Sequence, residues 1–292
     1  MPSITPLAPI SLVVAASTWG LVWYPYRLLQ EGGIGGSVSS LLTYALGIPL
    51  LALLAWRAER GATAAQWPWL LGVALSAGWT NLSYVLAVIH GEVMRVMLLF
   101  YLAPLWTVLF ARLLLGERAG SWGWAVIGLA LAGAWTMLGG GAAGWPLPAN
   151  TAEWLGLSSG LGFALTNVLT RRTRDIPIET RSLRVFAGVV AMSLLFMQFE
   201  GTSVATAARA GMQDWLMMAG ITLALLLATF SVQYGLAHSP ANRAIVILLS
   251  ELVVAALSSQ YLAGEAMGPR EWLGGGMIVA ATLFSMKLKH HE

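Results

Sequence analysis

A single carboxylic acid within a long apolar segment is the first candidate for chemistry. Glu251 lies midway along the run 241–263, and no other acidic or basic residue lies at a comparable depth. An ionisable side chain at the centre of a membrane segment costs at least about 2.5–3.5 kcal/mol, so such a group usually has a function. Glu251 could line a polar cavity or carry the proton of an exchange cycle. The alternative is a protonated carboxyl group that hydrogen-bonds a neighbouring helix.

Aromatic residues inside apolar segments form a second group of candidates. Tyr84 and Tyr101 carry hydroxyl groups that need partners inside a bilayer, which favours a cavity wall. Aromatic faces bind flat apolar groups by stacking and cations by cation–π contacts. The alternative is that these rings face lipid or pack between helices. We assign a substrate-binding role to Trp19, Trp23, Tyr24, Trp79, Tyr84, Tyr101, Trp106, Phe163 and Tyr234.

Amide side chains in or near the apolar segments form a third group. They are Asn81, Asn167, Gln233 and Asn242. An amide can hold both the ammonium and the carboxylate of a zwitterion without a fixed charge. The alternative is hydrogen bonding between helices.

Two histidines and two arginines are candidates for gating. His90 and His238 occupy equivalent turns, and each is followed by an arginine, Arg95 and Arg243. Histidine changes its charge near neutral pH, so these turns could act as a gate or a pH-sensitive latch. The alternative is a tight turn repeated by ancestry. The arginines could attract anions to the mouths of a cavity, or they could extend to lipid headgroups.

The composition indicates that the elements positioning these residues lie in a membrane. Of the 292 residues, 58% are hydrophobic and 10% are charged, whereas a soluble domain carries about 25% charged residues. The chain has no cysteine, which excludes disulfides and thiolate metal sites. A net charge of +3, spread along the chain, gives no reason to expect nucleic acid as a partner.

Ten apolar runs are long enough to cross a bilayer, whose core of about 30 Å requires about 20 residues. Turn residues or charges separate the runs. The sequence therefore predicts an all-α membrane protein with ten transmembrane helices at 7–29, 36–56, 67–89, 93–115, 121–139, 152–172, 182–200, 212–236, 241–263 and 270–287.

Positive charge predicts how these helices are oriented. With ten helices both termini share one side, and the segments on that side hold twelve of the sixteen lysines and arginines. Because positive residues concentrate in the cytoplasm, we expect cytoplasmic termini in a bacterial inner membrane. The first charged residue, Arg27, follows the first apolar run, so we expect this run to remain as a helix rather than be cleaved as a signal peptide.

An internal repeat supports the same topology. Shifting the chain by 148 residues aligns His90 with His238 and Arg95 with Arg243 without a gap. The same shift aligns the Gly-Glu pair at 116–117 with the pair at 264–265. A unit with five helices reverses its orientation when it is duplicated. Inverted repeats are common in secondary transporters, which bind substrate near the midplane where the repeats meet.

The ordered set of these features resembles a known family. Trp19-Gly20, Pro104 and the two Gly-Glu pairs are similar to the EamA-type five-helix unit, which occurs twice in the drug/metabolite transporter superfamily. The resemblance places the first unit at 1–146 and the second, inverted unit at 147–292. The tryptophan-rich first helix and the segment 81–84 most resemble the YddG-type aromatic amino acid exporters.

The second half departs from this pattern at two positions. Leu161 replaces the tryptophan of the Trp-Gly pair, and Leu252 stands where Pro104 would be repeated. Because proline removes a helical hydrogen bond, we expect a kink at Pro104 that has no counterpart in the second half.

Other patterns in the sequence are interpreted as structural. Small residues at every fourth position of 128–136 and 276–280 predict close helix packing, as a back wall or a dimer contact. The Gly-x-Ser-x-Gly sequence at 156–160 lies inside an apolar helix, whereas a nucleophile elbow needs a strand-to-helix turn. No nucleotide-binding or metal-binding motif occurs, so we expect no cofactor, no metal and no direct use of ATP.

The sequence therefore predicts a secondary transporter that is not an enzyme. We expect it to export aromatic amino acids and related small amphipathic metabolites by alternating access, as a monomer or homodimer. The alternatives are an exporter of other metabolites or of lipophilic cationic drugs. A channel should show a continuous polar face on several helices, and an intramembrane enzyme should show a reactive cluster at one depth; neither is visible.

Overall fold

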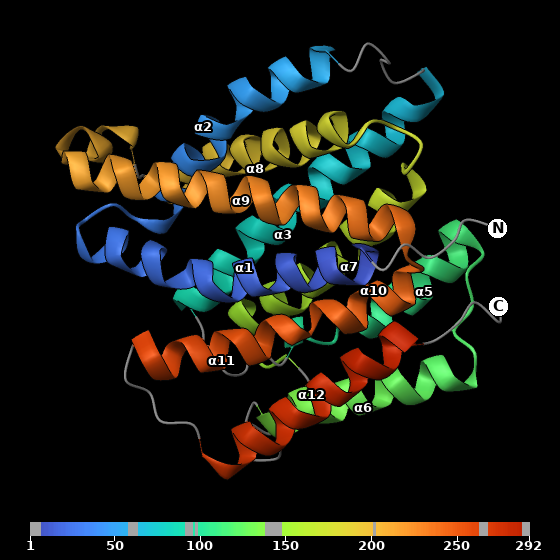
Figure 1. Ribbon diagram of the computed structural model, residues 1–292. Helices are drawn as coiled ribbons and strands as arrows, with labels where there is room; N and C mark the ends of the chain where they lie inside the picture. Colours follow the sequence, from blue (N-terminus) through green and yellow to red (C-terminus); the bar gives the residue numbers. More distant parts are fainter. Residues whose placement is uncertain are drawn as a thin grey trace.

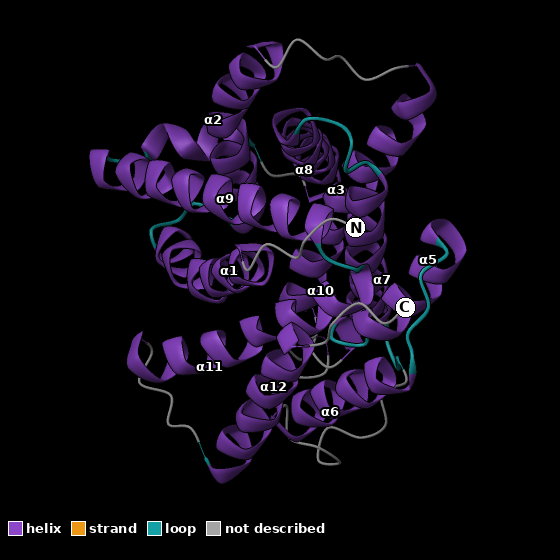
Figure 2. Cartoon of the chain, turned by 45° about the vertical axis from the view of Figure 1, so that its right-hand side comes forward, coloured by secondary structure: helices purple, strands orange, loops and turns teal. Residues whose placement is uncertain are grey.

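The computed structural model describes residues 7–57, 64–90, 96, 99–137, 148–200, 203–262 and 268–287, and this part of the chain is helical without strands (Figure 1, Figure 2). The helices α10 and α11 follow each other along one line (Figure 1) and count as one crossing of the membrane. The described helices therefore make ten membrane crossings, numbered here in chain order. The α-helices are α1 (Leu7–Glu31), α2 (Gly36–Arg57), α3 (Trp67–His90), α5 (Ala103–Leu115), α6 (Ser121–Met137), α7 (Thr151–Arg172), α8 (Ile178–Glu200), α9 (Met212–His238), α10 (Ala241–Leu248), α11 (Ser250–Leu262) and α12 (Pro269–Lys287). Short 3₁₀ turns cover Ala64–Gln66 and Val204–Arg209.

The outer surface of this bundle suits lipid. Five stretches of the described residues are by themselves long and apolar enough to cross a membrane, namely Leu7–Glu31, Gly36–Arg57, Ile178–Phe199, Met212–His238 and Ala241–Leu262. Large apolar side chains such as Leu113 and Leu223 are exposed along the helices. Exposed tryptophans lie near helix ends, where amphipathic rings meet a membrane interface. They are Trp56, Trp67, Trp122, Trp124, Trp154, Trp215 and Trp272.

The helices pack in pairs that relate the two halves of the chain. The first helix of each half packs against the third helix of the other half, so α1 contacts α9 and α7 contacts α3. The second helices, α2 and α8, pack against each other, and so do the fifth helices, α6 and α12. Likewise α1 packs on α11, and α7 packs on α5. Such reciprocal pairing is expected of two inverted five-helix repeats.

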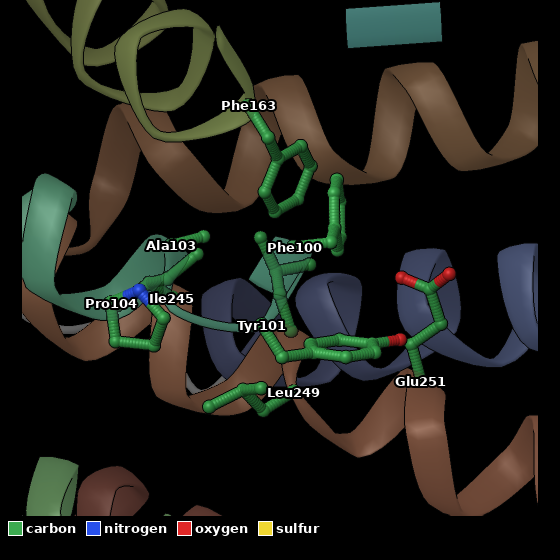
Figure 3. Close-up of a pocket in the computed structure, with 9 residues that line it drawn as sticks. Phe100, Tyr101, Ala103, Pro104, Phe163, Ile245, Leu249 and Glu251 are labelled. Carbon is green, nitrogen blue, oxygen red and sulfur yellow. The ribbon is translucent and has the colours of Figure 1, made fainter. Parts of the chain in front are cut away.

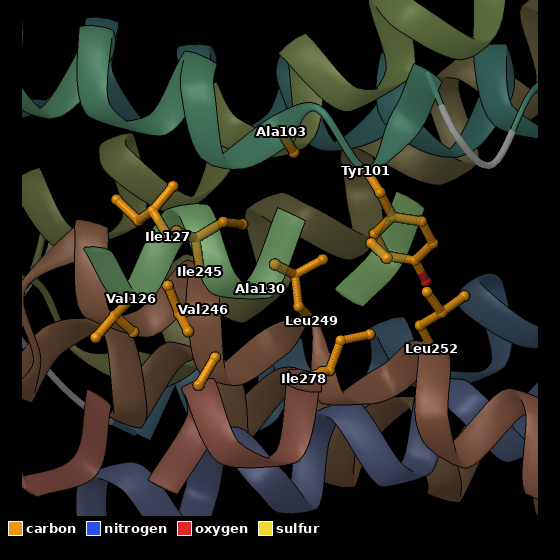
Figure 4. Close-up of a cluster of buried hydrophobic side chains, with 12 residues drawn as sticks. Tyr101, Ala103, Val126, Ile127, Ala130, Ile245, Val246, Leu249, Leu252 and Ile278 are labelled. Carbon is orange, nitrogen blue, oxygen red and sulfur yellow. The ribbon is translucent and has the colours of Figure 1, made fainter. Parts of the chain in front are cut away.

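The fifth helices attach to the rest of the bundle through one apolar cluster. Val126, Ile127 and Ala130 of α6 meet Ile278 of α12 and a group of side chains from α10 and α11 (Figure 4). Tyr101 belongs to the same cluster, which therefore extends to the centre of the molecule.

The close contact between α6 and α12 depends on a residue that the small-residue pattern did not identify. A Cβ atom on Gly133 would lie 2.8 Å from the Gly274 carbonyl oxygen, so these helices approach here. By contrast, Gly128 and Gly276 have no atom within 4 Å of such a Cβ and lie on the exposed surface. The stripe through Gly128 therefore faces outward and forms no back wall among the described residues, whereas the alternative, a dimer contact, stays a prediction.

The start of α1 and the end of α12 lie at one end of the bundle, together with the end of α5 and the start of α10 (Figure 1). We call this end the terminal face. The helices α5 and α7 run toward it, whereas α10 and α11 run away from it.

Candidate functional site

Two helix breaks meet near the centre of the molecule. The fourth crossing turns at Tyr101 and Leu102 before α5 begins, and the ninth crossing turns at Leu249 between α10 and α11. Tyr101 and Leu249 are 148 residues apart, which is the offset of the repeat. Broken helices at equivalent places of inverted repeats are typical of transporter binding sites.

Proline explains only one of these breaks. Pro104 stands in the first turn of α5, where its missing N–H has no intrahelical partner to lose. The second half breaks at Leu249 without a proline, and the Leu252 amide donates a hydrogen bond of 3.1 Å to the Leu249 carbonyl three residues earlier. The expectation that the kink at Pro104 has no counterpart was therefore wrong, since the second half interrupts its helix at Leu249 without a proline.

Glu251 lies in the first turn of α11, directly after the break. A helix N-terminus carries partial positive charge, which favours a carboxylate at this position. Gly20 of α1 packs against the backbone of Glu251, because a Cβ on Gly20 would lie 2.9 Å from the Glu251 carbonyl oxygen. Because Gly20 has no side chain, α1 packs closely against the start of α11.

A small pocket surrounds the two breaks. It has room for about one water molecule, so the centre of the bundle is closed around it. Figure 3 shows the ring of Tyr101 extending across the pocket with its hydroxyl group toward Glu251. The pocket is lined by Phe100, Tyr101, Ala103, Pro104, Phe163, Ile245, Leu248, Leu249 and Glu251.

Four of the predicted aromatic residues form a continuous series of ring contacts through the pocket. Phe163 contacts Trp19 at a centroid distance of 6.1 Å and Phe100 at 5.4 Å. Phe100 in turn contacts Tyr84 and Tyr101, each at 5.3 Å. The rings come from α1, α3, α7 and the segment before α5, so this aromatic series joins both halves of the chain.

Phe100 is a site residue that the sequence analysis missed. It was passed over because the fourth crossing was treated as one continuous helix, in which a phenylalanine is an ordinary lipid-facing residue. The signal that could have identified it is its place four residues before Pro104, where proline restricts the preceding turn.

The remaining predicted aromatics lie elsewhere. Trp23 contacts Tyr24 and donates a hydrogen bond of 2.9 Å from Nε1 to Ser258 Oγ of α11, which ties α1 to α11. Trp79 is exposed, and Trp106 is half-buried on α5. Tyr234 stacks on His238 at the end of α9. None of these contacts brings the five residues into the pocket.

The predicted amides divide into different environments. Gln233 is buried, and its side-chain oxygen accepts a hydrogen bond of 3.0 Å from Arg181. Arg181 also donates to the carbonyl groups of Thr170 and Ile176, so this interaction joins α7, α8 and α9. Asn81 lies partly buried on α3, whereas Asn167 is buried on α7.

The predicted gating residues are only partly described. Arg95 and the side chain of His90 lie outside the described residues. His238 is exposed, and its Nδ1 lies 2.8 Å from the carbonyl oxygen of Tyr234 within the same helix. Arg243 is buried in α10 with 8% of its surface exposed, so its side chain does not extend to headgroups.

A polar network at the terminal face joins the two halves. Glu117, directly after α5, forms an ion pair through Oε1 with Arg171 of α7. Its Oε2 accepts a hydrogen bond of 2.8 Å from the Ala241 amide at the start of α10. Arg171 also donates to the carbonyl oxygens of Leu236 and Ala237 at the end of α9. We call this set the terminal network.

Sequence reasoning assigned the terminal network no role. The sequence analysis uses the Gly-Glu pair at 116–117 as a signal of the repeat and of the family, and it gives Arg171 no individual role. The repeated Gly-Glu pair was the signal available: Gly116 adopts a φ of 71° that ends α5 and directs Glu117 back toward the bundle.

The Gly-x-Ser-x-Gly sequence has a packing role. The backbone of Phe100 packs directly on Gly160, and that of Val96 packs on Gly156. Between them, Ser158 donates a hydrogen bond of 2.9 Å to the Leu155 carbonyl of its own helix. The two glycines therefore let α7 approach the segment that carries Phe100.

Broken helices, reciprocal packing and a lipid-facing surface together define a multi-pass membrane transporter. The chain belongs to the EamA-like transporter family, whose model matches residues 7–139 and again residues 150–287, and so to the drug/metabolite transporter superfamily. An uncharacterized transporter of Archaeoglobus fulgidus is 28% identical over 222 residues, which are 75% of this chain and 76% of that relative. A solved crystal structure covers 97% of this chain and 98% of its own with a TM-score of 0.76; at 19% identity, this likeness concerns the fold.

Proposed function

We propose that the protein exports aromatic amino acids and related small amphipathic metabolites through the pocket at the two helix breaks. One observation carries the proposal: the aromatic series from Trp19 through Phe163 and Phe100 to Tyr101 ends beside the carboxyl group of Glu251. These rings contact one another in edge-to-face or tilted geometry, so their other edges and faces can contact the flat side chain of a substrate. Glu251 offers a partner for an ammonium group.

The substrate enters by displacing side chains that now fill the pocket. The pocket holds about one water molecule, so a molecule the size of phenylalanine requires the rings of Phe100, Tyr101 and Phe163 to move apart. Those rings are carried by different helices, and they separate when the helices rock. Part of their contact with one another is then replaced by contact with the substrate ring.

The reciprocal packing of the repeats supports a transport cycle by alternating access. The pair α1–α9 and the pair α7–α3 are equivalent contacts in two inverted units. A conformation that opens to one side of the membrane therefore has a counterpart, with comparable packing, that opens to the other side. In the proposed cycle the units 1–146 and 147–292 open in turn to the two sides of a bacterial inner membrane. The distribution of lysine and arginine supports a cytoplasmic position of the terminal face in this cycle.

Counterflow in proteoliposomes tests this function. Vesicles loaded with unlabelled phenylalanine are expected to accumulate labelled phenylalanine transiently, because a carrier exchanges substrate across the membrane whereas a channel does not. Tryptophan and tyrosine should compete, and leucine should compete weakly. If none of the aromatic amino acids competes, the proposed substrate is wrong.

Lipophilic cations are a second candidate substrate, and Glu251 is the observation in their favour. Among the described residues no ion pair joins Glu251 to a basic side chain, so its carboxyl group is available to a cation held between aromatic rings. Tetraphenylphosphonium in the same assay distinguishes the candidates. Strong competition by this cation without competition by tryptophan would favour drug export.

A further inference from the structure

Three polar side chains lie one helical turn from the pocket, on its terminal side. Residues three or four positions apart share a helix face. Thr107 therefore follows Ala103 on α5, and Asn167 follows Phe163 on α7. Asn242 lies three residues before Ile245 on α10. Ala103, Phe163 and Ile245 all line the pocket, so the three polar residues continue its wall toward the terminal face.

These three residues form a layer on helices that touch one another. The helices α5, α7 and α10 pack in all three pairs. Toward the terminal face, Ala111, one turn after Thr107, forms a buried apolar cluster with Val168 and Ala241, which directly adjoin Asn167 and Asn242 in sequence. The terminal network lies next, because Glu117 binds the Ala241 amide. We call Thr107, Asn167 and Asn242 the polar layer. It lies between the pocket and the terminal network.

Each member of the polar layer carries a buried polar atom without a partner. Thr107 is 0% exposed and Asn167 is 3% exposed. Thr107 Oγ1, Asn167 Nδ2 and Asn242 Oδ1 make no hydrogen bond to any described residue. A buried polar group that lacks a partner costs about 1–3 kcal/mol, so three of them around one path require an explanation.

We propose that the polar layer is a binding subsite for the zwitterionic head group of the substrate on its way between the pocket and the terminal face. The amide nitrogen of Asn167 can donate to a carboxylate, and the amide oxygen of Asn242 can accept from an ammonium group. The hydroxyl group of Thr107 can do either. In this step the aromatic ring is in the pocket, and the head group lies one turn closer to the terminal face, with its ammonium group no longer at Glu251. This subsite rests on the proposed function, since it names the chemistry of the same substrate.

A comparison of two threonines tests the subsite. Thr282 on α12 is also a buried threonine whose Oγ1 finds no partner among the described residues, but it lies away from the pocket. Thr107→Val and Asn167→Leu are expected to raise the half-saturating concentration of phenylalanine in counterflow about tenfold, which corresponds to about 1.4 kcal/mol. Thr282→Val should leave it unchanged within about twofold.

Head-group preference separates binding from a structural effect. Wild-type protein should prefer phenylalanine to phenylethylamine, which lacks the carboxylate. Thr107→Val and Asn167→Leu should reduce this preference, whereas a change in packing alone would weaken both ligands together. An unchanged preference in both variants would overturn the subsite.

Thiol labelling tests the polar layer without assuming a substrate. The chain has no cysteine, so single cysteines can be introduced into the full-length protein directly. A membrane-impermeant maleimide applied to the terminal face should label Thr107→Cys and Asn242→Cys at least about fivefold faster than Thr282→Cys. If wild-type protein does not transport phenylalanine, the proposed substrate fails while this labelling still supports a hydrated polar layer. Equal labelling of all three cysteines would overturn the layer itself.

Discussion

Glu251 is an ionisable residue at a helix break. It is therefore the residue to test for coupling of transport to proton movement. Glutamine has nearly the same shape but does not titrate, so Glu251→Gln should retain the fold and lose any dependence of phenylalanine flux on pH. We expect flux through the variant to be constant between about pH 5.5 and about pH 8.5, whereas wild-type flux changes across this range.

The matched control for this variant is Glu31→Gln. Glu31 is exposed at the end of α1 and pairs with Arg27, away from the pocket. Its substitution should leave the wild-type pH profile intact. If Glu251→Gln also retains that profile, Glu251 has no part in proton coupling and contributes polarity alone.

Phe163 links the two ends of the aromatic series, since it contacts both Trp19 and Phe100. An aromatic pair is worth about 0.5–1.5 kcal/mol beyond its buried area. Phe163→Leu should therefore weaken phenylalanine binding about threefold to tenfold, measured by competition in counterflow. Phe199→Leu is the control, because Phe199 is 80% exposed on α8. Equal effects of the two substitutions would show that the series does not bind substrate.

At the scale of single residues, type and position along the chain predicted part of the pocket. Tyr101, Phe163 and Glu251 were identified because aromatic, hydroxyl and carboxyl groups are unusual inside apolar runs. Trp23 has the same character, but it bonds to Ser258, 235 positions away in sequence. Which face of a helix meets which neighbour depends on tertiary packing, and a helix that is apolar on all sides gives no periodic signal of that face.

At the scale of elements, Gly20 sets the distance between α1 and the break that carries Glu251. A methyl group there would lie 2.9 Å from both the Glu251 carbonyl oxygen and Val254 Cβ. Overpacking of this kind costs about 1–3 kcal/mol, so Gly20→Ala should lower the melting temperature in detergent and reduce transport.

Gly128→Ala provides the comparison on α6. A Cβ at Gly128 meets nothing within 4 Å, and alanine favours the helix by about 1 kcal/mol relative to glycine. This variant should keep or raise the melting temperature. A loss of stability in Gly128→Ala as large as that in Gly20→Ala would contradict the assigned α1–α11 contact.

Element boundaries were largely predictable, whereas the helix breaks were not. The length needed to cross a bilayer fixes where apolar runs start and end, and the bounds of α2, α7 and α12 follow the expected runs closely. The break at Leu249 lies in a stretch of apolar residues with no glycine or proline. Neither of the residue types that most often interrupt a helix stands there, so local sequence does not predict this break.

At the scale of the whole molecule, the terminal network joins the two halves of the chain at the terminal face, so we expect it to stabilise closure of this face. Glu117 and Arg171 come from different halves of the chain, and their side chains are only 20% and 13% exposed. Removing one partner leaves the other charge poorly solvated and frees the start of α10 from α5. Glu117→Ala should therefore shift the protein toward a state that is open at the terminal face, and Glu117→Gln should do so less, because an amide oxygen still accepts from the Ala241 amide.

The rate at which an impermeant maleimide labels Val168→Cys measures this opening, since Val168 is fully buried in the apolar cluster beside the terminal network. An equilibrium shift of about 1.4 kcal/mol changes the open population tenfold, so Glu117→Ala should accelerate labelling by about that factor. Glu31→Ala, which breaks the exposed pair with Arg27 at the opposite end of α1, should leave the rate unchanged. If both variants label at the wild-type rate, the terminal network stabilises the local turn alone, and closure of this face depends on the apolar cluster.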